Sequence, residues 1–192
     1  MRIKLPCALI AMSLAACAEG QPIPQTQEAD KPAMAIPAAP ATSPTSLPVV
    51  ADGVKANRII VDKSDRVLIL YDGDTEIARY SGIRFGDAPA GHKQFEGDEK
   101  TPEGEYRING RNPASRYHLS LRISYPNAAD RAYAKSQGKD PGGDIFIHGQ
   151  PNGYNDPVIA RDWTDGCIAL SNAEIAQIWK LVPDGTKIII QP

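Results

Sequence analysis

The sequence predicts a β-rich α+β domain, a mixed sheet or sandwich of short strands with two or three short helices, preceded by a disordered tether. Three observations predict it: short apolar runs between polar turns, two helix start signals, and the absence of aromatic residues from 18–53. The chain has 192 residues, of which 42% are hydrophobic and 23% are charged. These values fit one folded domain with tails and exclude disorder of the whole chain.

The predicted strands follow from hydrophobic patterning. Residues 58–61 and 66–71 flank a polar turn at 62–65, which is a hairpin pattern. Residues 117–125 place apolar side chains at odd positions, so one face of this strand should be buried and the other polar. Residues 86–104 are rich in glycine and charge and are predicted to form a long loop. The predicted strands are 58–61, 66–71, 76–85, 105–109, 117–125, 145–147 and 187–190.

Two helices are predicted from their start and stop signals. The first covers 127–137, is rich in alanine and stops at Gly138. The second begins at a capping box formed by Ser171 and Glu174. Its core-facing positions are Ile175, Ile178, Trp179 and Val182.

The N-terminus reads as an export signal over residues 1–16. A basic start with Arg2 and Lys4 precedes an apolar run that is too short to span a membrane. The run ends in Leu14-Ala15-Ala16-Cys17, which resembles a bacterial lipobox, so Cys17 is the predicted lipidation site. The alternative is an ordinary secretory signal that is cleaved nearby, for example after Ala18.

Residues 17–53 are then predicted to be the lipidated cysteine and a disordered tether rich in alanine and proline. Fully extended, such a tether reaches on the order of 110 Å. The folded domain is predicted over 54–192. The expected location is the periplasm, with a lipid anchor in a membrane. Because Ala18 follows Cys17, resemblance to Gram-negative lipoproteins favours the outer membrane.

Charge and cysteine content exclude several classes of function. Lys and Arg total 21 against 23 Asp and Glu, which argues against nucleic acid as a partner. Three scattered histidines lack the ligand spacing of a zinc site, so no metal or other cofactor is expected. Cys7 leaves with the signal and Cys17 carries lipid, which leaves Cys167 as a lone thiol. Such a thiol is either buried and inert or reactive.

A candidate catalytic pair lies in the C-terminal third. The apolar strand at 145–147 delivers His148 at its end, and Gly149 lets the chain turn away. Nineteen positions after His148, Cys167 lies on a glycine-containing turn just before the capped helix. A thiol and an imidazole at the ends of rigid elements are what thiol nucleophilic catalysis needs.

These residues resemble the signature of the L,D-transpeptidase catalytic domain (YkuD type), and the resemblance covers 55–192. His148, fifteen intervening residues, the motif Thr164-Asp165-Gly166-Cys167 and then Asn172 match the family pattern. Two positions depart from it: Asp165 replaces the usual histidine before Gly-Cys, and Ala169 replaces a frequent arginine. These departures put the choice of substrate in doubt.

The resemblance implies a mechanism on peptidoglycan stem peptides. Cys167 would attack the carbonyl before a D-amino acid, with His148 as the base. The Gly149 carbonyl would hold the second ring nitrogen, and the N–H groups of Gly166 and Cys167 would form the oxyanion hole. An amine acceptor, for which an outer-membrane lipoprotein is one candidate, gives transfer. Water gives carboxypeptidase or cross-link hydrolysis, and a third alternative is an inactive wall-binding lipoprotein.

Further residues are predicted from their positions alone. The predicted substrate-binding residues are Thr164, Asp165, Tyr125, Asn127, His118 and Arg122. For His118 a solvent-facing position is the alternative, and for Thr164 a turn-stabilising hydroxyl is equally open. Lys93 is, like Arg122, either a partner for substrate carboxylates or a solvated cation. His92 is expected to be structural or exposed, and Trp163 and Trp179 are expected in the core.

Overall fold

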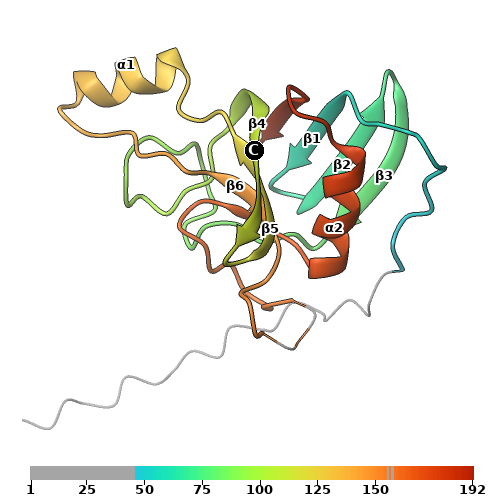
Figure 1. The fold of residues 1–192 in the computed structure, drawn as a ribbon. Coiled ribbons are helices and arrows are strands. Elements are labelled where there is room, and N and C mark those ends of the chain that lie inside the picture. The colour runs from blue at the N-terminus through green and yellow to red at the C-terminus, as the bar shows by residue number, and fades with distance from the viewer. Residues whose placement is uncertain (1–45, 155, 157) are drawn as a thin grey trace, which may run out of the picture. The chain divides into compact units, whose positions relative to one another are not determined.

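The computed structural model describes residues 46–154, 156 and 158–192, in which eight strands and two helices form (Figure 1). The predicted signal peptide, Cys17 and the tether up to residue 45 lie outside the described residues. In the described part, neither helix has the length and apolar character needed to cross a membrane. The elements are β1 Arg58–Asp62, β2 Val67–Asp72, β3 Thr75–Ser81, β4 Gly104–Ser115, β5 His118–Ile123, α1 Ala128–Ser136, β6 Phe146–His148, β7 Ile168–Ala169, α2 Asn172–Leu181 and β8 Lys187–Gln191.

All eight described strands join one mixed sheet in the order β3-β2-β1-β8-β4-β5-β6-β7. The pairs β1·β8 and β6·β7 are parallel, and the other neighbours are antiparallel. The predicted β-rich α+β class is therefore confirmed. The order places β6 and β7, which border the candidate catalytic residues, at one edge of the sheet.

The core lies between the sheet and α2, which packs against β5 and β6 (Figure 1). On α2 the buried side chains are Ile175, Ile178 and Leu181, the i, i+3, i+6 positions of one helical face. Leu121 and Ile147 are fully buried on the strands that this helix covers. Each buried aliphatic side chain contributes about 1.5–3 kcal/mol, so α2 is a stable platform behind β6.

Both helix starts confirm the capping signals in the sequence. Asn127 caps α1, and its side chain accepts hydrogen bonds from the N–H groups of Ala129 and Asp130. Ser171 caps α2, and Glu174 completes the predicted capping box. Each such cap stabilises its helix by about 1 kcal/mol and fixes where the helix begins.

The predicted strands are found, with three main changes of length, one of which is that the strand expected over 117–125 covers only His118–Ile123 as β5. The third strand was expected over 76–85, but β3 ends at Ser81 because Gly82 adopts a left-handed conformation with φ of 73°. Arg84 instead pairs with Ala169 on β7. The strand expected over 105–109 extends to Ser115, because β4 continues along β5 with two irregularities in register.

Residues 46–53, which the sequence assigns to the tether, form neither helix nor strand. Part of this segment nevertheless contacts the folded domain. Val50 packs against the core, and the Gln177 side chain on α2 donates a hydrogen bond of 2.7 Å to the Pro48 carbonyl. Contact with the domain therefore begins about four to six residues before the predicted boundary at 54.

Candidate active site

The short strand β6 positions His148. Its partner residues are Ser120 on β5 and Ala169 on β7, so the strand is held on both sides. After it, the Asn172 side chain accepts a hydrogen bond of 2.8 Å from the Gln150 N–H. A Cβ at Gly149 would lie 2.5 Å from the same Asn172 oxygen, so only glycine allows this approach. Asn172 and Gly149 therefore fix the chain just beyond His148.

Cys167 lies directly before β7, in register beside β6. The Phe146 N–H points at the sulfur, with a nitrogen–sulfur distance of 3.4 Å. Side chains two residues apart on a strand share a face, so His148 and Phe146 project to the same side. Cys167 and His148 line one pocket of about 620 Å³. The structure thus brings the predicted thiol and imidazole into one cleft.

A tight turn presents the cysteine. Gly166 has φ of 126°, and a Cβ there would lie 2.5 Å from the Lys100 carbonyl oxygen, so the turn requires glycine. The Thr164 hydroxyl donates to the Cys167 carbonyl at 2.8 Å and accepts from the Gly166 N–H at 3.2 Å. Thr164 therefore stabilises the turn and also lines the pocket.

Residues 86–104, which we call the support loop, pack behind this turn. Gly86 pairs with Thr164, and the Lys100 carbonyl lies against Gly166. Two buried lysines hold the loop: Lys63 pairs with Glu103 at 2.7 Å, and Lys93 pairs with Asp98 at 2.8 Å. Asp98 also accepts three backbone N–H groups, from Gln94, Phe95 and Lys100.

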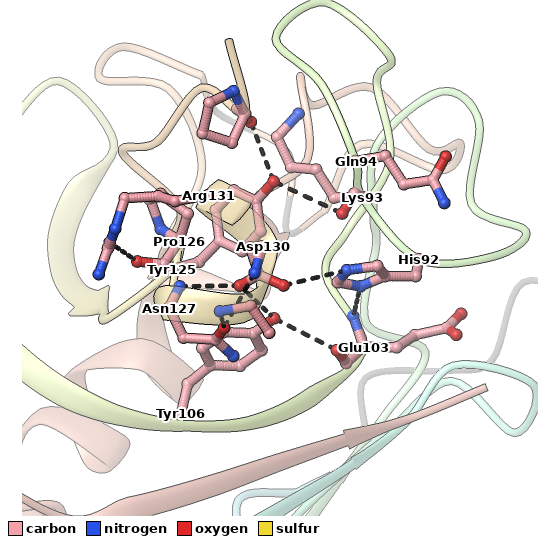
Figure 2. Close-up of polar contacts among 12 residues, drawn as sticks. His92, Lys93, Gln94, Glu103, Tyr106, Tyr125, Pro126, Asn127, Asp130 and Arg131 are labelled. Atoms are coloured by element: carbon pink, nitrogen blue, oxygen red, sulfur yellow. Dashed lines mark hydrogen bonds and ion pairs between the residues drawn. The ribbon is translucent and has the colours of Figure 1, made fainter. Parts of the chain in front are cut away.

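A second network ties the support loop to α1 and β4 (Figure 2). The His92 Nδ1 atom accepts from the Glu103 N–H at 2.9 Å, and Nε2 lies 3.2 Å from Asp130. The other oxygen of Asp130 accepts from the Tyr106 hydroxyl at 3.0 Å and from the Asn127 N–H at 2.8 Å. His92 is therefore structural, as expected, and Asn127 serves to begin α1.

The buried imidazole is held neutral and oriented. His148 is 3% exposed, and this burial lowers its pKa to about 4. Its Nδ1 atom lies 2.7 Å from the Gly149 carbonyl, the contact that the sequence predicted. A carbonyl accepts only a protonated nitrogen, so Nδ1 carries the hydrogen and Nε2 has a free lone pair. The ring is therefore ready to accept a proton at Nε2.

The thiol is held protonated. Partial burial raises the pKa of Cys167 to about 11, and the carboxylates of Asp165 and Asp144 add to the rise, while the Phe146 N–H opposes it. The thiol donates to the Asp144 carbonyl, with a sulfur–oxygen distance of 3.6 Å. Because the pKa of the imidazole lies far below that of the thiol, the resting pair is neutral. Proton transfer must then accompany the attack of sulfur on a substrate.

One of the two predicted oxyanion donors is already engaged. The Gly166 N–H donates to Thr164, as described above. In the described part of the chain, the Cys167 N–H has no hydrogen-bond acceptor. The Cys167 N–H is therefore a free donor at the turn, and Gly166 contributes mainly by allowing the shape of the turn.

Two aromatic side chains surround the imidazole. Tyr117 stacks on His148 with ring centroids 4.6 Å apart and an interplanar angle of 29°. Trp163 meets the same ring edge-on at 5.6 Å. Trp163 was expected in the core, but it is only partly buried and lines the pocket. Tyr117 was not predicted at the site, because only its alternation within a strand was visible in the sequence.

Several predicted substrate-binding residues lie elsewhere. The pocket lining includes Thr164 and Asp165 and does not include the other four. Tyr125 is 2% exposed, and its hydroxyl donates to the Pro141 carbonyl at 2.9 Å. His118 is exposed at the start of β5, and Arg122 is exposed and pairs with Asp144 at 3.5 Å. With Asn127 in its capping role, these residues surround the site or lie outside it.

The described residues contain no side-chain cluster suited to binding a metal ion. No group of three or more His, Cys, Asp and Glu side chains is arranged there to hold an ion. Among the predicted pocket residues, Cys167, His148, Thr164 and Asp165 come together. The arrangement they form is a protonated nucleophile beside a neutral base and a free backbone donor, which suits acyl transfer through a thioester.

Comparison with known proteins gives a consistent result. Residues 56–190 match the YkuD family, the L,D-transpeptidase catalytic domain. YafK of Escherichia coli strain K12, provisionally assigned as an L,D-transpeptidase, is 35% identical over 145 residues, which cover 70% of this chain and 50% of YafK. The chain spans about half the length of the curated relatives it matches.

Among solved structures, the fold is similar to Pgp2 of Campylobacter jejuni, described as a helical cell shape determining protein. The two share 29% identity with a TM-score of 0.57, over 72% of this chain and 48% of Pgp2.

Proposed function

The chain belongs to the YkuD family of L,D-transpeptidase catalytic domains, and from this premise we propose that it modifies peptidoglycan through a thioester on Cys167. The observation that carries the proposal is that one pocket is lined both by a partly exposed thiol and by a buried imidazole whose Nε2 atom is free. The likeness to Pgp2 supports a role in shaping the cell wall.

The first half of the proposed reaction forms the thioester. As the Cys167 sulfur bonds to the stem-peptide carbonyl that precedes a D-amino acid, its proton passes to Nε2 of His148. The Cys167 N–H stabilises the oxyanion. The C–N bond then breaks, and His148 returns the proton to the departing amine. The D-amino acid leaves with a neutral amino group, and the acyl group stays on sulfur.

The second half releases the acyl group. An amine acceptor attacks the thioester, His148 takes the proton of the incoming nitrogen, and this proton restores the thiol as sulfur leaves. The proposed acceptor is an amino group of a second stem peptide or of an outer-membrane lipoprotein, which makes the reaction a transpeptidation.

Mass spectrometry of muropeptides tests this proposal. Purified sacculi incubated with the protein should gain new cross-links or attached lipoprotein. Loss of terminal D-alanine or of existing cross-links would instead make the protein a hydrolase. No change at all would make it an inactive binder.

The Cys167→Ala variant is the matched control. It should lower either activity by about 10³-fold or more, because the nucleophile is absent. Its free energy of unfolding should change by about 1 kcal/mol or less, since the side chain is small and partly exposed. An Ala variant that retains full activity would refute the assignment.

We also propose that the protein is a periplasmic lipoprotein anchored through Cys17, most simply in the outer membrane. The N-terminal signal pattern supports this location. Mass spectrometry of the mature N-terminal peptide tests it. A peptide that begins at Cys17 and carries a diacylglyceryl group is expected, and an unmodified peptide that begins at Glu19 would contradict the anchor.

A further inference from the structure

The hairpin that joins β4 to β5 forms one wall of the catalytic pocket, and we call residues 112–117 the hairpin wall. Its backbone is attached to the segment that follows His148. The Gly149 N–H donates to the Tyr117 carbonyl at 3.0 Å, and the Asn152 N–H donates to the Arg116 carbonyl at 2.9 Å. The Asn152 side chain adds a bond of 3.0 Å to the Ser115 carbonyl. The backbone of Arg116 is therefore fixed relative to the imidazole.

In contrast to its backbone, the side chain of Arg116 is not held by any described residue. It is exposed and lines the pocket, yet within the described chain it has no ion pair and no side-chain hydrogen bond. It is the only lysine or arginine among the described residues that line this pocket. The other charged lining residues are Asp144 and Asp165. An anionic substrate group would be repelled by these carboxylates, and Arg116 offers the compensating charge.

The position of Arg116 determines which substrate group it can meet. The next residue, Tyr117, stacks on the His148 ring, so the backbone of Arg116 lies on the imidazole side of the pocket, and Arg116 is one of the residues that line it. In the proposed reaction His148 protonates the amine that leaves, so the departing amino acid must also occupy this side. In a terminal D-amino acid, one carbon atom separates this amine from the carboxylate.

From this geometry we propose that Arg116 binds the free carboxylate of the departing D-amino acid. This inference rests on the proposed function and adds a specificity to it. A planar guanidinium binds a carboxylate through two parallel hydrogen bonds. The site therefore prefers stem peptides that end at the residue after the cleaved bond, over those in which that carboxylate is blocked.

Two matched substrates test the proposal: a disaccharide tetrapeptide ending in D-alanine, and the same compound ending in D-alaninamide. The wild-type protein should release D-alanine with a kcat/KM roughly tenfold to hundredfold above that for the amide. Arg116→Gln should remove most of this preference, chiefly by raising KM for the acid, and should change the amide reaction little. Arg116→Lys should keep more of the preference than Arg116→Gln, because lysine retains the positive charge but cannot form the two parallel hydrogen bonds.

Arg107→Gln is the control, since Arg107 is exposed on β4, the strand that leads into the hairpin, and its side chain bonds to the Gly185 carbonyl, outside the pocket. It should keep the wild-type preference. If Arg116→Gln keeps the preference for the D-alanine substrate over its amide, or if the wild-type protein has no such preference, the role proposed for Arg116 is wrong while the proposed function stands. If the wild-type protein cleaves neither substrate, and sacculi also remain unchanged, the proposed function itself fails and this inference fails with it.

Discussion

The two regions that flank the catalytic pair are built in opposite ways. The support loop behind Cys167 is held by buried ion pairs and by the His92–Asp130 network (Figure 2). The hairpin wall beside His148 has a fixed backbone but leaves the side chain of Arg116 without a partner in the described chain. The support loop therefore uses its charges for stability, whereas the hairpin wall keeps the charge of Arg116 available for a ligand.

Removing a buried cation from the support loop should give the largest change in stability. Lys93→Met leaves the Asp98 carboxylate without its cation, and we expect the free energy of unfolding to fall by about 3–5 kcal/mol. Urea unfolding measures this directly. Arg79→Met, which breaks an exposed ion pair with Glu76, is the control and should cost less than about 1 kcal/mol. Equal losses in the two variants would show that the support loop does not depend on its buried charge.

The neutral state of His148 should appear in the pH dependence of stability. Its pKa is about 4 when folded and 6.5 when unfolded, so the unfolded chain binds the extra proton between these values. Stability is therefore complete above about pH 6.5 and is lost as the pH falls, by about 2 kcal/mol at pH 5. Urea unfolding of the wild type and of His148→Gln at pH 7 and 5 measures this, and the variant should lose less. If the wild type and His148→Gln lost the same unfolding free energy between pH 7 and pH 5, a buried neutral ring would be contradicted.

The aromatic contact on the hairpin wall should have the smallest effect. Tyr117→Leu removes the ring that stacks on His148, and we expect kcat/KM for D-alanine release to fall about twofold to tenfold. The acid limb of the pH profile of kcat/KM should move to higher pH at the same time, because better hydration of the imidazole raises the pKa of His148. Tyr117→Phe keeps the ring and should behave like the wild type. A Phe variant as impaired as the Leu variant would assign the effect to the hydroxyl instead.

Local rules made much of the fold predictable. The first hairpin, both helix caps and the strand that ends at His148 depend on residues close together in sequence. The extension of β4 beyond Asn109 was not predictable, because its pairing with the next strand, β5, has two irregularities in register that interrupt the alternating pattern. The two-residue strand β7 depends on pairing with β6, which lies on the other side of a long loop. A strand of two residues also carries no periodicity to recognise.

The candidate site was likewise predictable only in part. The spacing of His148 and Cys167, each next to a glycine, could be recognised in the sequence. The neighbours of the imidazole could not, because Tyr117 and Trp163 reach it only after β5 and the loop before Cys167 fold together. Tyr125 was predicted at the substrate channel from its place at a strand end, yet its side chain turns into the core. Strand patterning predicts a face, and the loops decide which of its residues meet the site.

The central claim is that the sulfur of Cys167 attacks an acyl carbon with His148 as its base. The most direct test is mass spectrometry of the intact protein, followed by peptide mapping, after exposure to a carbapenem, whose strained amide acylates a nucleophilic thiol. The account predicts one carbapenem mass per chain, located on Cys167, with slow formation in His148→Gln and none in Cys167→Ala. No adduct on the wild-type protein, or the same adduct on Cys167→Ala, would contradict it.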